Sequence, residues 1–137
     1  MPPNNKGKTD LPKTPHGELV GRTWAMPADA NANGDIFGGW VMAQMDMGAA
    51  VIARRVARRR VTTVAVDGMS FIFPINVGDL VSCYAELVSE GTTSMKINVE
   101  VWVERGATGE ALRTTEAIFT YVCIDENGRP VPIRLRK

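Results

Sequence analysis

The sequence predicts an α+β domain in which one antiparallel β-sheet wraps around one long helix. Three observations support this prediction. A single apolar stretch of helical length runs from about residue 37 to 57, four segments rich in β-branched and aromatic residues follow it, and the links between them are short. Short links favour antiparallel pairing, because parallel strands need a longer crossover.

Composition restricts the class of protein. The chain has 137 residues, of which 45% are hydrophobic, and a formal net charge of +1. This length suits one domain with a core of its own, and the apolar fraction excludes disorder for most of the chain. The balance of 16 basic and 15 acidic residues lacks the excess positive charge of a dedicated nucleic-acid binder. We therefore expect a cytoplasmic protein with no nucleic-acid or membrane partner.

The two ends of the chain are expected to lie outside the folded domain. Residues 1–18 contain four prolines and almost no apolar side chains, which predicts a flexible leader. The only histidine, His16, falls in this leader and is not expected to take part in catalysis. We predict a single domain over residues 19–128 and a tail over 129–137, with a first short strand at 18–26 and a polar loop, PADANANGD, after it.

The helix predicted from Phe37 to Ala57 has only Gln44 and Asp46 as polar residues before its arginine-rich end. Its length and these two polar groups argue against a membrane span. A helix that is apolar on all sides belongs in the middle of a fold. We therefore place it at the centre of the domain, with the arginines at its C-terminal end complementing the helix dipole.

The strands are predicted at residues 61–73, 79–90, 94–105 and 111–125. In the third of these, apolar residues alternate with polar ones, so one face is expected to contact the core. The two cysteines, Cys83 and Cys123, lie in such alternating stretches and are predicted to be buried thiols. A sheet of this kind leaves free edges, and pairing of two edges across a two-fold axis would remove them, which predicts a homodimer.

Asp46 is the main candidate for chemistry. The positions three, four and seven residues away from it on the helix are mostly small: Gly39, Met42, Ala43, Ala49, Ala50 and Ala53. One interpretation is a close contact between helix and sheet, with Asp46 hydrogen-bonded or near solvent. The other is a crevice in which a ligand or a second backbone reaches the carboxylate, which the cost of burying an unpaired charge favours.

Gly38 and Gly39 open the same helix and leave its first N–H groups uncovered by side chains. Such donors suit a developing oxyanion, although two glycines also simply permit tight packing. Gly38 and Asp46 are eight residues apart, which is about 12 Å along a helix and about 80° around it. One reacting carbonyl cannot touch both in a single chain. If both act in one reaction, they come from two protomers.

Several segments resemble a known family. PADANANGDIFGGWVMAQMD, followed by GMSFIFPINVGD, GTTS and NVEVWVE, is similar to the YciA-like acyl-CoA thioesterases of the hotdog-fold superfamily, over roughly Leu19 to Asp125. The resemblance implies the hotdog fold, a sheet wrapped around a central helix, in dimers that often form a trimer of dimers. It also implies hydrolysis of acyl-CoA to a free acid and CoA, with no metal and no cofactor besides the CoA of the substrate.

The resemblance also implies roles for single residues. Asp46 matches the helix carboxylate that acts as general base or nucleophile toward the thioester, and Gly38, with Gly39 beside it, matches the amide that polarises the thioester carbonyl. Asn31 matches a polar residue of the opposing protomer that positions water or the carbonyl. Asp35 lies inside the motif and is assigned first to structuring the loop.

The predicted contacts to CoA are Asp35, Ser70, Thr93, Ser94 and Arg58. The run Ala53 to Arg60 suits phosphates but is more often a solvated helix end, and Thr93 and Ser94 are equally suited to forming a turn. Similar sequences often carry Arg or Lys where this one has Phe73, so a phosphate contact is missing there.

Two other functions are compatible with a fold of this kind. Hotdog dehydratases usually rely on a catalytic histidine, and no histidine falls in the predicted core. A non-catalytic acyl-CoA sensor remains the alternative, because it would bind the same ligand without turning it over.

Overall fold

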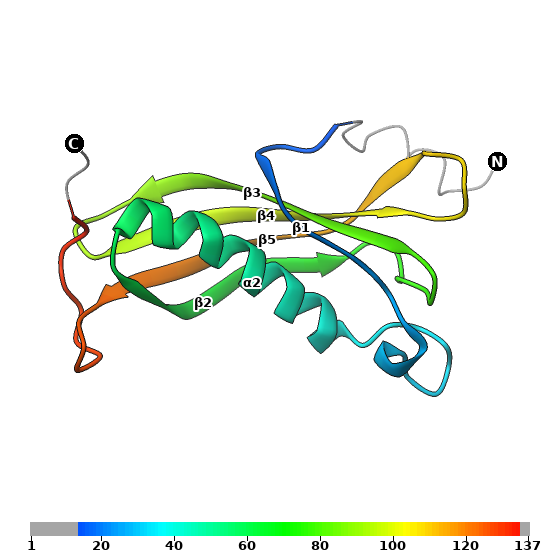
Figure 1. Ribbon diagram of the computed structural model, residues 1–137, viewed down its shortest axis with the longest axis horizontal. Helices are drawn as coiled ribbons and strands as arrows, with labels where there is room; N and C mark the ends of the chain where they lie inside the picture. The colour runs from blue at the N-terminus through cyan, green and yellow to red at the C-terminus, as the bar shows by residue number, and fades with distance from the viewer. Residues whose placement is uncertain (1–13, 135–137) are drawn as a thin grey trace.

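One five-stranded antiparallel sheet and one long helix make up the fold of residues 14–134, the part of the chain that the computed structural model describes (Figure 1). The elements are β1 (Glu18–Trp24), a short 3-10 helix η1 (Pro27–Asp29), α2 (Gly38–Ala57), β2 (Arg60–Phe71), β3 (Leu80–Glu90), β4 (Ser94–Glu104) and β5 (Ala111–Ile124). The predicted α+β class is confirmed, and the helix and the four long strands begin and end within two residues of their predicted limits.

The strands follow the order β1-β3-β4-β5-β2 across the sheet. All four pairings are antiparallel, as the short links predict. However, β2 pairs with β5 and not with β3, its successor in the chain, so residues 72–79 carry the chain from one side of the sheet to the other. Strands β1 and β2 are therefore the two edges of the sheet within the described chain.

The hydrophobic core lies between α2 and the sheet. The helix contacts all five strands and lies across one face of the sheet (Figure 1). The alternation in β4 orients five apolar residues toward the helix, and all five are buried: Met95, Ile97, Val99, Val101 and Val103. Gly48 lets β1 approach α2 closely, since a Cβ atom there would lie 2.7 Å from Val20 Cγ2.

The expectation of a helix buried on all sides is wrong for the single chain. One side of α2 packs on the sheet, and the other exposes Ala43, Met42 (39% exposed) and Met47 (59% exposed). The reason is geometric, because a single five-stranded sheet curves around only one side of a helix. An apolar helix face in this position is typical of an interface with another chain.

Both ends of the described chain contact the domain. Residues 14–18, assigned to the leader, include the start of β1, and the imidazole Nδ1 of His16 lies 2.8 Å from Oε2 of Glu100. Glu100 is fully buried on β4 and also accepts a hydrogen bond from Trp102 Nε1, so His16 helps to compensate a buried charge. At the other end, Val131 and Ile133 pack against the core. Residues 1–13 and 135–137 lie outside the described residues.

The contact between His16 and Glu100 makes stability depend on pH. Hydrogen bonding to Glu100 and its negative charge, with smaller effects of Glu86 and Glu116, raise the pKa of His16 above its usual 6.5. A pKa raised in the folded state means that the ion pair stabilises the fold fully below pH 6.5, and that this contribution is lost as the pH rises through the raised pKa. We expect the difference in Tm between wild type and His16→Gln to shrink from acidic to alkaline pH. A difference that stays constant over that range contradicts the ion pair.

Both cysteines are free and buried, which confirms the predicted thiols. Cys83 lies on β3 and Cys123 on β5, and both side chains belong to the core. Burial raises the pKa of Cys83 to about 12. Within residues 14–134, α2 and the other helical segment are too short or too polar to cross a membrane.

Candidate active site

Asp46 lies near the middle of α2, half-buried, and its carboxylate is held by two hydroxyl groups of the sheet. Thr63 Oγ1 donates a hydrogen bond of 2.6 Å to Asp46 Oδ1. The hydroxyl oxygen of Tyr121 lies 2.6 Å from the same Oδ1 and 2.8 Å from the backbone oxygen of Asp46. No hydrogen bond from residues 14–134 reaches Oδ2. Within the described residues, Oδ1 is therefore hydrogen-bonded to the protein, and Oδ2 can accept a hydrogen bond from a ligand or water.

Thr63 and Tyr121 reach Asp46 from two neighbouring strands. They are register partners, Thr63 on β2 and Tyr121 on β5, and both side chains point toward α2. Burial, the hydrogen bond to Asp46 and the negative charge of Asp46 raise the pKa of Tyr121, so its hydroxyl stays protonated and acts as a donor. Sequence reasoning did not identify either residue. The available signal was Tyr121 itself, a hydroxyl on the buried face of a strand, which needs a polar partner.

The start of α2 presents free backbone donors. Phe37 caps the helix without a side-chain hydrogen bond, and the first N–H groups with a helical acceptor are those of Trp40 and Val41. The N–H groups of Gly38 and Gly39 have no acceptor within the described chain, and both residues are exposed. Around Gly39 no heavy atom lies within 4 Å of the position of a Cβ, whereas a Cβ on Gly38 would meet the ring of Phe71 at 3.5 Å.

The polar loop before the helix is folded by its own side chains. Asn31 Oδ1 accepts hydrogen bonds from the backbone N–H groups of Asn33 (2.8 Å) and Asp35 (3.2 Å). The backbone of Asp35 also bonds Asn31 and bridges to Asn76, so Asp35 contributes to the loop through its main chain. The oxygen of the Asn31 amide is thus used by the loop, and its amide nitrogen has no acceptor within residues 14–134.

The predicted CoA-binding residues lie at two ends of the molecule. Ser70 is exposed near the end of β2, next to Phe71, which faces the start of α2. Thr93 and Ser94 lie at the other end, where the carbonyl of Thr93 accepts a hydrogen bond from Cys123. Arg58 follows α2 at that same end in a left-handed conformation (φ 55°) that terminates the helix. A single chain therefore does not bring these residues together with Asp46.

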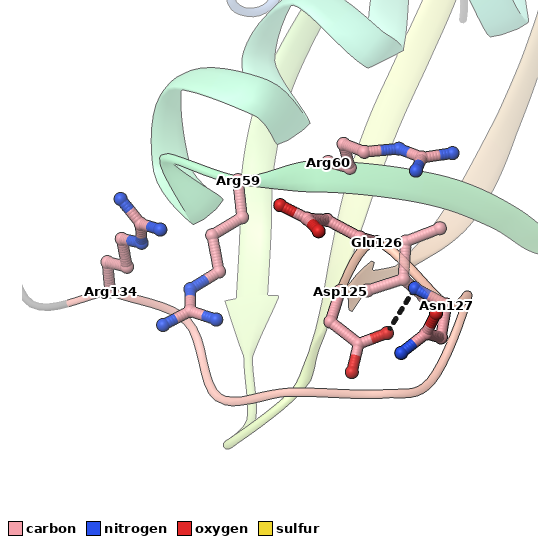
Figure 2. Close-up of a pocket in the computed structure, with 7 residues that line it drawn as sticks. Arg59, Arg60, Asp125, Glu126, Asn127 and Arg134 are labelled. Atoms are coloured by element: carbon pink, nitrogen blue, oxygen red, sulfur yellow. Dashed lines mark hydrogen bonds between the residues drawn. The ribbon is translucent and has the colours of Figure 1, made fainter.

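A hollow of mixed charge lies beyond the C-terminal end of the helix (Figure 2). Figure 2 shows Arg59, Arg60 and Arg134 around a space that Asp125, Glu126 and Asn127 also line. Arg59 Nε is buried and has no hydrogen-bond partner in the described chain. Next to it, Arg54, Arg55 and Arg58 line a second, more basic hollow, which is the better match to the predicted phosphate contact.

Comparison with known proteins gives one consistent result. Residues 33–110 match the thioesterase superfamily. The chain is 56% identical over 128 residues to the acyl-CoA thioester hydrolase YciA of Salmonella typhimurium, a match that covers 91% of this chain and 96% of the relative.

Solved structures agree with that match. The hexameric thioesterase y2039 of Yersinia pestis has a TM-score of 0.85 and 54% identity, over 89% of this chain and 100% of that one. An aspartate-to-alanine mutant of a hexameric, broad-specificity acyl-coenzyme A thioesterase also has a TM-score of 0.85, with 51% identity over 89% of this chain and 90% of that one.

Proposed function

Since the chain belongs to the thioesterase superfamily, we propose that it hydrolyses acyl-CoA to a free acid and CoA. The carboxylate of Asp46 and the N–H groups at the start of α2, which have no acceptor within residues 14–134, support this proposal. The substrate class comes from relatives that are 56% identical and named acyl-CoA thioester hydrolases. The observation that carries the chemistry is Asp46, a half-buried carboxylate whose Oδ1 is held by two hydroxyl groups and whose Oδ2 has no hydrogen-bond partner within residues 14–134.

Two routes are open to Asp46. As a general base, it takes a proton from water while the water oxygen attacks the thioester carbon, and the CoA thiolate then leaves and is protonated. As a nucleophile, its oxygen attacks the same carbon and expels the thiolate, and water then cleaves the mixed anhydride to return the carboxylate and the free acid. In both routes negative charge develops on the thioester oxygen. The N–H groups of Gly38 or Gly39 are the proposed donors to it.

The site requires two protomers. Gly38 and Asp46 are separated by about 12 Å along one helix, which exceeds the reach of one carbonyl group. The exposed apolar face of α2 and the free edge strand β2 offer a surface on which a second copy can pack. We propose a dimer in which the helix start of one protomer faces Asp46 of the other, assembled as a trimer of dimers like the hexameric relatives.

The remaining polar residues are the proposed contacts to the CoA part of the substrate. Arg58, at a basic helix end about 18 Å along the helix from Asp46, is the proposed phosphate contact. Thr93 and Ser94 lie at that same end of the chain, and Ser70 and Asp35 near the start of α2. The amide nitrogen of Asn31, which has no acceptor within residues 14–134, is the group proposed to position water or the carbonyl.

The proposed function predicts that Asp46→Asn lowers kcat by about 10²- to 10⁴-fold, because the amide can neither accept the proton nor attack the carbonyl. Release of free thiol from a series of short to long acyl-CoAs measures this directly. Glu86→Gln is the matched control, since Glu86 is exposed on the inner strand β3, away from Asp46 and from the edge strand β2.

The same assay separates the alternatives. If Asp46→Asn retains turnover, the function stands and the catalytic carboxylate is a different one, with Asp35 the next candidate. If the wild type binds acyl-CoA but hydrolyses no member of the series, the protein is a sensor and the proposed function is wrong.

A further inference from the structure

Three arginines without a counter-ion line the mixed-charge hollow beyond the C-terminal end of α2 (Figure 2). The side chains of Arg59, Arg60 and Arg134 form no hydrogen bond or ion pair within residues 14–134, although acidic residues line the same hollow. Arg59 is half-buried, and its Nε is shielded from solvent and has no acceptor there. A buried N–H without an acceptor is costly, so an acceptor atom from a bound molecule is expected at this position.

The backbone places Arg59 and Arg134 at the same end of the helix. The N–H of Arg134 donates a hydrogen bond of 3.2 Å to the carbonyl of Ala57, the last residue of α2. Arg58 then ends the helix in its left-handed conformation, and Arg59 follows it directly. Two segments that are far apart in the sequence therefore present their guanidinium groups on one side of the hollow, as Figure 2 shows.

The opposite side of the hollow consists of hydrogen-bond acceptors on the turn after β5. Asp125 Oδ1 accepts hydrogen bonds from the backbone N–H groups of Asn127 (2.8 Å) and Arg129 (3.0 Å), which fold this turn. Glu126 is exposed beside it. These carboxylates repel a bare anion, whereas a ligand that carries hydroxyl or amino donors next to an anionic group has partners on both sides.

We propose that this hollow binds the phosphate monoester of a nucleotide, with Arg59 and Arg134 on the phosphate and the acceptors of the turn on the sugar or base. Guanidinium groups donate paired hydrogen bonds that match phosphate oxygens, and two of them balance the charge of a monoester near pH 7. The volume of about 430 Å³ lies in the range of small-molecule sites.

Two sources carry this chemistry, the ribose phosphate of CoA and a free nucleotide. The first source rests on the proposed function, because it makes the hollow part of the substrate site. The hollow is in either case distinct from the contact proposed for Arg58, which lines the neighbouring basic hollow and not this one.

Isothermal titration calorimetry with adenosine 3′,5′-bisphosphate tests the site without any turnover. We expect the wild type to bind this probe, and Arg59→Gln and Arg134→Gln each to weaken the binding by about 10-fold, because each removes charge-assisted hydrogen bonds. Arg59→Lys keeps the charge without the paired donors and is expected to recover only part of the affinity.

Arg129→Gln is the matched control for these variants. It removes the same charge from the same region, and its side chain is exposed and does not line the hollow. We expect it to bind the bisphosphate as the wild type does. Arg134 is exposed as well, so Arg134→Gln tests the contact without a change in the core.

Steady-state kinetics separates the two sources. If the ribose phosphate of CoA occupies the hollow, Arg59→Gln raises the KM for acetyl-CoA by about 10-fold and leaves the KM for acetyl-dephospho-CoA, which lacks that phosphate, unchanged. If a free nucleotide occupies it, both KM values stay as in the wild type, and the bisphosphate still binds to protein saturated with CoA.

Two results overturn the inference: a wild type that does not bind the bisphosphate, and equal binding by the wild type, Arg59→Gln and Arg134→Gln. The proposed function fails separately. A protein that binds the bisphosphate through these arginines but hydrolyses no acyl-CoA retains the nucleotide site and is not a hydrolase.

Discussion

Gly38→Pro is expected to fold normally and to lose about 10²- to 10³-fold in kcat, the range found when one oxyanion donor is removed. Proline lacks an N–H, and Gly38 is the first residue of α2, a position where that N–H has no helical acceptor and proline is well tolerated. The preceding residue, Phe37, already has φ −59° and ψ 136°, the extended conformation that a residue before proline prefers. The substitution therefore removes the proposed donor and little else. Steady-state kinetics measures the loss of kcat, and circular dichroism checks that the fold is retained.

Gly38→Ala is the matched control for this prediction. Its Cβ would lie 3.5 Å from the Phe71 ring, an ordinary contact, and it retains the N–H. We expect it to keep most of the wild-type kcat. If Gly38→Pro stays as active as Gly38→Ala, the N–H of Gly38 is not the donor, and the neighbouring N–H of Gly39 becomes the candidate.

Mixing two inactive variants is expected to restore activity. If each site combines Asp46 of one protomer with Gly38 of the other, a dimer of one Asp46→Asn chain and one Gly38→Pro chain has one intact site and one doubly defective site. Random exchange of equal amounts makes about half of the dimers mixed, so activity should recover to about a quarter of the wild-type value. Subunits are mixed under conditions that allow exchange, and thiol release is then measured.

Unmixed samples of each variant, treated identically, are the controls. A mixture that is no more active than these samples contradicts the two-protomer arrangement, because that arrangement gives every mixed dimer one intact site. The N–H of Gly38 and the carboxylate of Asp46 then do not act together in one reaction.

Much of the fold could be predicted because its signals are local. The apolar stretch at 37–57 and the turn residues between the strands are recognised from neighbouring residues alone, and α2 and the long strands lie within two residues of the limits predicted from them. The order of the strands cannot be predicted from such local signals, because the pairing of β2 with β5 depends on how the whole sheet curves around the helix. The exposed half of α2 could not be predicted either, since an apolar surface has the same sequence pattern whether it contacts the same chain or another one.

In the candidate site too, residues within one short segment could be predicted, whereas contacts between distant segments could not. Asp46 and the glycines at the start of α2 were identified from one short segment, where a charge in an apolar helix and two adjacent glycines are conspicuous. Tyr121 is 75 positions from Asp46, and their contact depends on the register between β2 and β5. His16 was assigned to a flexible leader because its own segment is polar, while its partner Glu100 lies on a strand far along the chain.

The burial of the two cysteines has a consequence for the product of the proposed reaction. Hydrolysis of an acyl-CoA releases a thiol at the protein surface, and thiols exchange with disulfides and oxidise together with other accessible thiols. Cys83 and Cys123 lie in the core, and the raised pKa of Cys83, about 12, leaves it almost entirely in the unreactive protonated form. Because both side chains are buried, neither is accessible for exchange with a disulfide that oxidation of the released CoA would form, so CoA is not captured covalently on these two residues.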